Sequence, residues 1–397
     1  MTDFTATKAR FRLPEGVIYL DGNSLGPLAI GVEERLGRVV AEEWGGELIR
    51  AWNSAGWMTQ PTRVGDRIAR LIGAEKGSVV MGDTLSIKVY QALAAALAMV
   101  PDRRIVLSDN GNFPSDLYIA EGLLRSLGPD YVLQIVEPEE VVDAIDERVA
   151  VVMLTEVDYR TGRRHDMPAL TRQAHASGAR AIWDLAHSAG ALPVNVAAGR
   201  ADFAVGCTYK YLNGGPGAPA FIYVAPRHAD AALPALSGWM GHAAPFAFEQ
   251  GYRPGPGIER MRVGTPPILA LAALDAALDV WDEVQIADVR SASIRLSERF
   301  IAEVESRCPA LSLASPRDPA QRGSQVSFRH PDGYAIMGAL IARGVIGDFR
   351  APDILRFGFA PLYLGEDEVI AAARVLVDVL NSRAWDTSDF RSKGLVT

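Results

Sequence analysis

The sequence predicts an α/β domain, in which helices cover a buried sheet, followed by a smaller α+β domain. Helix-like and strand-like segments alternate from about residue 60 to 225. Several strand-like segments are continuous apolar runs, such as Val149–Leu154, which is typical of strands buried on both faces. From about residue 286, an amphipathic helix precedes a shorter alternation of strands and helices.

In chain order, the first domain is predicted to contain helices at 61–72, 86–100, 116–128 and 167–178, and strands at 77–82, 103–109, 131–136, 148–157, 179–187, 201–208 and 219–224. Many alanines and apolar residues at helical spacing indicate the helix at 86–100. Gly128 ends the predicted helix at 116–128. Ligands of such sheets bind beyond the C-terminal ends of the strands, so the polar residues at those ends are the candidates for function.

The second half of the chain begins with a predicted helix at 264–284 that has prolines in its first turn. The amphipathic helix follows at 286–306, and the last predicted elements are a strand at 323–330, a helix at 333–344, a strand at 353–360 and a helix at 366–381. The tail from residue 385 to 397 is expected to be disordered.

Composition excludes several functional classes. The net charge of −8 argues against nucleic acid or an anionic membrane as a partner. The two cysteines, Cys207 and Cys308, provide no disulfide framework, and the six histidines lack metal-ligand spacing, so no metal is expected. The N-terminus lacks the apolar core of a signal peptide, and the longest apolar run, 92–100, is too short to span a bilayer. We therefore expect a cytoplasmic protein.

Two charged residues follow apolar strands at the expected ligand edge. Asp184 ends the apolar run of the strand predicted at 179–187. Lys210 comes 26 residues later, between two tyrosines and before a glycine-rich stretch. A lysine in such apolar surroundings is costly unless it is paired, neutral or used covalently. The arrangement favours pyridoxal phosphate (PLP), with Lys210 as its Schiff-base lysine and Asp184 against the pyridine nitrogen. A helix N-cap for Asp184 and a structural role for Lys210 are the alternatives.

Two further stretches suit the rest of such a cofactor. Thr84 and Ser86 lie where a strand gives way to a helix, so hydroxyl and backbone N–H groups there would hold a phosphate, although simple helix capping is an equal alternative. Phe113 follows the strand at 103–109 and could stack on the cofactor ring, with Asp116 nearby. A loop phenylalanine is also an ordinary core residue.

The chain resembles the kynureninases, a PLP-dependent family of fold type I in the branch of the class V aminotransferases, and its pattern is of the bacterial type. The stretches that carry the resemblance are "YLDGNSLGPL", "AWNSAGW", "NFPSD", "DLAHSAG", "CTYKYLNGGPGAPAF", "GWMGH", "RVGTPPI" and "LRFGFAPLY". They extend over essentially the whole chain. The resemblance implies a large domain with a mostly parallel seven-stranded sheet at 51–280, a small C-terminal domain at 281–397, and an N-terminal segment, 1–50, that packs with the small domain and a dimer partner.

The resemblance also assigns roles to single residues. Lys210 would carry the cofactor and later move protons at the substrate's α carbon, while Asp184 would pair with the pyridine nitrogen. Tyr209 would contact the phosphate and is a candidate general acid. The remaining cofactor-binding positions that the resemblance implies are Leu85, Ser86, Phe113, Pro114, Ser115, Asp116, Thr155, His187, Trp239 and Thr265.

Substrate contacts and assembly are implied in the same way. Arg356 fits the arginine that binds the substrate's α-carboxylate, for which a bidentate guanidinium is the natural partner. Trp239 and Thr265 match positions that reach the cofactor of the neighbouring subunit, which implies a homodimer with shared active sites. Vertebrate-type members have a histidine near the position of Trp57 and an asparagine at the position of Thr265. Their absence from this chain favours plain kynurenine over 3-hydroxykynurenine as the substrate.

The reaction so implied is hydrolysis of L-kynurenine to anthranilate and L-alanine in tryptophan catabolism, with 3-hydroxykynurenine as a second candidate substrate. Another class V enzyme, an aminotransferase or a cysteine desulfurase, is the main alternative. A desulfurase needs a mobile nucleophilic cysteine, and neither Cys207 nor Cys308 suits that role. A PLP-binding regulator is the alternative from another class, but no basic DNA-binding module precedes the α/β domain.

Overall fold

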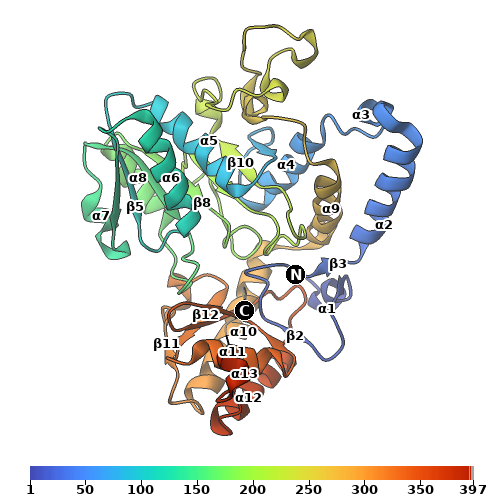
Figure 1. Cartoon of the computed structure of the whole chain (residues 1–397), viewed down its shortest axis with the longest axis vertical. Coiled ribbons are helices and arrows are strands. Elements are labelled where there is room, and N and C mark those ends of the chain that lie inside the picture. Colours follow the sequence, from blue (N-terminus) through green and yellow to red (C-terminus); the bar gives the residue numbers. More distant parts are fainter. Residues whose placement is uncertain (393, 395–397) are drawn as a thin grey trace.

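The computed structural model describes residues 1–392 and 394, and Figure 1 shows a large upper layer of sheet and helices above a smaller lower unit. A seven-stranded sheet has the order β4-β10-β9-β8-β7-β5-β6. Its strands are β4 (Val79–Met81), β5 (Ile105–Asp109), β6 (Val132–Val136), β7 (Val149–Thr155), β8 (Arg180–Asp184), β9 (Phe203–Gly206) and β10 (Phe221–Val224). Only β10 runs antiparallel to its neighbours. The predicted fold class, with a mostly parallel sheet of seven strands, is confirmed.

Helices cover both faces of this sheet, as continuous apolar strands require. One face packs against α5 (Leu85–Ala98) and α6 (Pro114–Leu127). The other face packs against α4 (Gln60–Leu71), α8 (Met167–Ala176) and α9 (Ile268–Leu278). The helix predicted at 264–284 is shorter in the structure, where α9 spans Ile268–Leu278. Pro266 and Pro267 precede α9, and a 3₁₀ turn, Asp279–Glu283, follows it.

The smaller unit contains a four-stranded antiparallel sheet with the order β11-β12-β15-β14. Its strands are β11 (Ser312–Leu313), β12 (Gln325–Arg329), β14 (Asp348–Arg350) and β15 (Ile354–Gly358), and its helices are α10 (Ile286–Glu305), α11 (Gly333–Ile341) and α12 (Glu366–Asn381). The predicted helices and strands of this half are confirmed. Within the predicted disordered tail, α13 (Ser388–Arg391) is ordered, because Arg391 pairs with Asp332 and Asp386. Residues 393 and 395–397 of that tail lie outside the described residues.

The N-terminal segment joins the small unit. Its strand β2 (Ile18–Tyr19) pairs in parallel with β13 (Val345–Ile346), and the amide of Gly358 donates to the carbonyl of Leu20. The segment also contains α1 (Phe4–Lys8), β1 (Phe11–Arg12), β3 (Leu28–Ala29) and α2 (Gly31–Arg38), which is followed by α3 (Ala51–Ser54). The domain boundaries at residues 50 and 280 stay predictions. Along residues 1–392 and 394, no helix has the length and hydropathy needed to cross a membrane.

Candidate active site

A pocket of about 200 Å³ lies at the C-terminal ends of β5, β7 and β8, where the small unit meets the large sheet. The topology predicts a ligand site at this edge. The pocket is lined by Asn23, Ser24, Leu85, Ser86, Phe113, Ser115, Asp116, Thr155, Tyr159, Asp184, Ala186, His187, Tyr209, Lys210, Arg350 and Arg356. Most of the site residues expected from the sequence are thus brought together in one place. Asn23, Ser24, Tyr159 and Arg350 were not expected there.

Lys210 lies among aromatic and imidazole rings. Its Nζ is 2.8 Å from Nε2 of His187, and 5.9 Å from the ring centroids of both Phe113 and Tyr209. Burial, and then the positive charge of Lys210, lower the pKa of His187 well below its usual range. His187 is therefore neutral at pH 7, and a neutral imidazole nitrogen can accept a hydrogen bond from the lysine amine.

Two carboxyl groups share the pocket with this lysine. Asp184 is the last residue of β8, and its Oδ1 accepts a hydrogen bond of 2.8 Å from the amide of Ala186. Burial raises the pKa of Asp184 to about 6. Burial, and then the charge of Asp184, raise the pKa of Asp116 well above its usual range. Among the described residues, Oδ2 of Asp116 has no hydrogen-bond partner. A bound cation would stabilise both carboxylates.

Two helix N-termini open on the same pocket. Ser86 lies in the first turn of α5 and Ser115 in the first turn of α6, and their hydroxyl oxygens are 2.9 Å apart. The side chains of the N-cap residues, Thr84 and Phe113, make no capping hydrogen bond within the described part of the chain. The first N–H groups of α5, and in α6 the N–H of Ser115, because Pro114 has none, can therefore bind an anion such as a phosphate.

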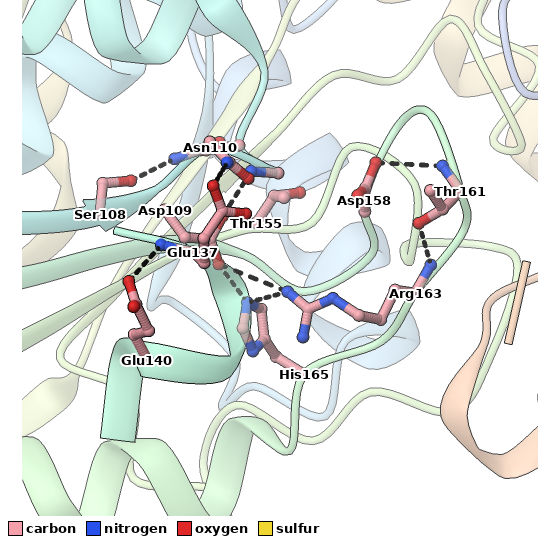
Figure 2. Close-up of polar contacts among 12 residues, drawn as sticks. Ser108, Asp109, Asn110, Glu137, Glu140, Thr155, Asp158, Thr161, Arg163 and His165 are labelled. Atoms are coloured by element: carbon pink, nitrogen blue, oxygen red, sulfur yellow. Dashed lines mark hydrogen bonds and ion pairs between the residues drawn. The ribbon is translucent and has the colours of Figure 1, made fainter. Parts of the chain in front are cut away.

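A polar network fixes the loop that follows β7 (Figure 2). Oδ2 of Asp109, the last residue of β5, lies 2.5 Å from Nε2 of His165, and Arg163 approaches both groups at 3.5 and 3.0 Å. Oδ1 of Asp109 accepts the amide of Gly111 at 2.9 Å. The network therefore ties the loop at 156–165 to the strand end that leads to Phe113.

The same loop is also bonded to the small unit. The carbonyl of Tyr159 accepts hydrogen bonds from Nε2 of Gln325 at 3.0 Å and from Nη1 of Arg356 at 2.6 Å. The Tyr159 ring packs edge-on against Phe113, with the ring centroids 5.1 Å apart. Phe113 and Arg356 come from different units of the fold, and this loop connects them.

Arg356 lies on β15 and is 1% exposed. Asp348 stands directly opposite it on β14. Nε and Nη2 of Arg356 bond the two carboxylate oxygens of Asp348, and Nη2 also donates to Oγ of Ser24 at 2.8 Å. The resemblance assigns this guanidinium to the substrate's carboxylate. In the structure its bidentate face is directed at Asp348.

Tyr209 lines the pocket next to Lys210. Burial, and then the neighbouring Cys207 thiol, raise the pKa of the Tyr209 phenol above its usual range. The phenol stays protonated at pH 7 and can donate a proton but does not act as a resting base.

Four of the site residues that the resemblance implies do not line this pocket. Trp239 and Thr265 line a second, apolar pocket of about 560 Å³ together with Ile49, Trp52, Asn53, Met58, Met240 and Phe246. Trp57 packs against Trp52 and donates its indole N–H to Glu43 at 2.7 Å. Pro114 is the first residue of α6 and sets the direction of that helix, but does not line the pocket.

Known proteins of similar sequence are kynureninases. The family model "Kynureninase C-terminal domain" matches residues 289–376. The chain is 51% identical to the kynureninase of Pseudomonas fluorescens and 50% identical to that of Burkholderia pseudomallei (strain 1106a), in each case over 98% of this chain and 95% of the relative.

Solved structures show the fold. The apo cysteine desulfurase of Thermococcus onnurineus NA1 superposes with a TM-score of 0.80 at 19% identity, over 96% of this chain and 99% of the desulfurase. A C-DES mutant with glycine covalently linked to its PLP cofactor has a TM-score of 0.82 at 15% identity, over 95% of this chain and all of that chain. This likeness shows fold type I and carries no statement about the substrate.

Proposed function

The chain belongs to the kynureninase family and is a PLP-dependent hydrolase acting on kynurenine, and from this premise we propose the roles that its residues take in the reaction. The enzyme cleaves L-kynurenine to anthranilate and L-alanine. The observation that supports the roles is that Lys210, Asp184 and Arg356 line one pocket.

The pocket fits PLP. Lys210 would hold the cofactor covalently through Nζ, and Asp184 would face its ring nitrogen, where a cation suits two buried carboxyl groups. Ser86 and Ser115, at two helix N-termini, would hold the phosphate. When bound, the cofactor supplies an electron sink for charge that develops on the substrate's carbon atoms.

We assign proton transfer at the substrate's α carbon to Lys210. The neutral His187 lies 2.8 Å from Nζ and can accept a hydrogen bond from the lysine. This hydrogen bond fixes the position of the Lys210 side chain. His187 thus acts on the reaction by positioning Lys210.

Tyr209 is the proton donor that we assign to the ketone end of the substrate. Its raised pKa keeps the phenol protonated, so it can donate to the carbonyl oxygen as water adds to that carbon. Donation of a hydrogen bond to the cofactor's phosphate is the alternative role for the same hydroxyl group. Arg356 orients the substrate through its carboxylate, and Phe113 would cover the ring of the cofactor.

We further propose a homodimer in which each subunit completes the other's site. Trp239 and Thr265 line the second pocket, away from Lys210. The segment between β10 and α9 forms the projection at the top of Figure 1, and it exposes Trp239, Phe246 and Phe248 by 42, 61 and 77%. Exposed aromatic clusters are typical of protein interfaces. In a dimer, the second subunit would cover these aromatic side chains. Trp239 and Thr265 of each subunit would then lie at the cofactor of the other subunit.

The chain lacks the histidine near Trp57 and the asparagine at position 265 that vertebrate-type members have. This supports a preference for plain kynurenine over its 3-hydroxy derivative, because a site that selects a hydroxyl group needs dedicated hydrogen-bond partners. A desulfurase activity is disfavoured by the cysteines. Cys207 and Cys308 are buried at 2 and 3% exposure, and burial raises the pKa of both thiols, so neither is a mobile nucleophile. The cytoplasmic location stays a prediction of the sequence.

The first test mixes purified protein, PLP and L-kynurenine and follows anthranilate fluorescence together with alanine. We expect equimolar anthranilate and alanine from the wild type and none from Lys210→Ala, which should also lose the absorbance band of lysine-bound cofactor. A band without anthranilate would contradict the function and leave the cofactor site standing. Release of sulfide from L-cysteine, or amino transfer to a keto acid, would then identify the alternative enzyme.

A further inference from the structure

Two of the polar side chains that line the active-site pocket, and that have no role in the function proposed above, lie close to Arg356. They are Arg350, on β14, and Asn23, in the N-terminal segment just after β2. Both lie next to the arginine that we assign to the substrate's carboxylate, and neither was expected at the site from the sequence.

Arg356 alone offers little to a carboxylate. A guanidinium has five N–H donors. Four are engaged here: Nε and one Nη2 donor by Asp348, the second Nη2 donor by Ser24, and one Nη1 donor by the carbonyl of Tyr159. Within residues 1–392 and 394, one Nη1 donor is left. Recognition of two carboxylate oxygens therefore needs donors from other side chains.

Arg350 is placed to supply them. It lies two residues after Asp348 on the same strand, so both side chains project to one face of the sheet. Its Nη2 is 2.7 Å from Oδ2 of Asp348, and its Nη1 donates to the carbonyl of Phe349 at 3.0 Å. The side chain is 32% exposed and lines the pocket, and Nε has no partner in the described part of the chain.

Asn23 is the independent observation that indicates a ligand. Its side chain is completely buried and lines the same pocket. Across the described residues, neither its Oδ1 nor its Nδ2 has a hydrogen-bond partner. It packs so closely on β15 that a Cβ atom on Gly358 would come within 2.1 Å of Oδ1. A buried amide without partners is costly, and a bound carboxylate would satisfy its N–H group.

The charges at this end of the pocket also match a single anion. Arg350 and Arg356 carry two positive charges. Burial opposes ionisation of Asp348, but the charge of Arg356 outweighs it and lowers the pKa of Asp348, so that carboxylate supplies one negative charge. Burial, and then Asp348, raise the pKa of Asp21 to about 7, so it is largely neutral below pH 7. One positive charge remains to be balanced.

We propose that Arg350 and Asn23 bind the α-carboxylate of the substrate together with Arg356. Arg350 donates from its guanidinium edge, Asn23 donates Nδ2–H, and Asp348 holds the two arginines side by side despite their like charge. The proposal rests on the kynureninase activity of this site and names two further substrate-positioning residues in it.

The test compares two ligands that differ only in the carboxylate. For wild type, Arg350→Gln and Asn23→Ala holoenzymes, we would measure KM and kcat for L-kynurenine, and the inhibition constant of the decarboxylated amine of kynurenine. Loss of a charge-assisted hydrogen bond corresponds to about a 10- to 100-fold change. We expect KM to rise by about that factor for Arg350→Gln and by about tenfold for Asn23→Ala. The inhibition constant of the amine should change less than about threefold, because the amine has no carboxylate to lose.

Arg160→Gln is the matched control, because Arg160 is also a half-buried arginine near Tyr159 but does not line the pocket. It should leave both constants within about twofold of wild type. Arg350→Lys keeps the charge without the planar donor edge and should give an intermediate KM. Equal weakening of both ligands, or no change in KM, would refute the proposal. Absence of anthranilate from the wild type would instead refute the activity itself.

Discussion

Substitution of Asp348 by asparagine is expected to destabilise the protein by about 3–5 kcal/mol, because it leaves a buried guanidinium without its charge partner. Asp348 and Arg356 are 2 and 1% exposed and stand opposite each other on β14 and β15. Two charge-assisted hydrogen bonds from Arg356, at about 1.5–3 kcal/mol each, give a similar range. Arg350 also loses its charge partner in this variant, so we expect the loss of stability to lie in the upper half of the range of about 3–5 kcal/mol.

The assay is equilibrium urea unfolding of the holoenzyme at one fixed protomer concentration. Asp353→Asn is the matched control, because its carboxylate pairs with Arg329 at the surface of the same sheet, 3.0 Å away, with side chains 29 and 49% exposed. Such a surface pair is worth about 0–1 kcal/mol. Equal losses of free energy in the two variants would show that the buried pair has no special weight. The double variant Asp348→Leu with Arg356→Met should recover stability without recovering activity.

Two more predictions concern the large domain. Tyr209→Phe should lower kcat by about 10²–10³-fold while the cofactor remains bound at saturation, whereas a weaker affinity for PLP with unchanged kcat would identify Tyr209 as a phosphate ligand only. Asp202 should stabilise the protein at neutral pH: burial raises its pKa, but hydrogen bonds from His175 and His228 outweigh burial and lower it. Because the folded-state pKa lies below the unfolded value near 4, this stabilisation is present above about pH 4 and is lost as the pH falls further. Thermal unfolding of wild type and Asp202→Asn should therefore differ most at pH 7 and converge toward pH 3, and a constant difference would contradict the linkage.

The fold could be predicted because its information is local. Apolar runs such as Val149–Leu154 predict buried strands wherever they occur, and α10 begins and ends within one residue of the amphipathic pattern. Asp184 and Lys210 could be found for a similar reason, since a charge at the end of an apolar strand, or a few residues after it, lies at the sheet edge where ligands bind. The short helix at 388–391 could not be predicted, because it depends on ion pairs of Arg391 with a residue 59 positions away.

Of the residues at the proposed carboxylate end of the site, Arg356 was expected from the sequence, but Asn23 and Arg350 could not be predicted. Asn23 reaches the pocket only because β2 pairs with β13, which follows more than 300 residues later. Arg350 has the same face of the sheet as Arg356, but that register becomes visible only when β14 and β15 are paired. The spacing of six residues between the two arginines gives no such indication, since a turn separates their strands.

The loop that follows β7 is joined to the small unit through its main chain. The carbonyls of Asp158 and Tyr159 accept from Gln325, that of Arg160 accepts from Ser327, and that of Thr161 accepts from Ser315. A joint built from carbonyl groups does not depend on which side chains the loop carries. Its length is fixed, however, because one inserted residue would shift every carbonyl away from its donor. Point substitutions at Arg160 and Thr161 should therefore be tolerated far better than insertions or deletions in this loop. Gly162 is excepted, because its φ is +73° and a Cβ atom there would come within 2.9 Å of the Gln325 side chain.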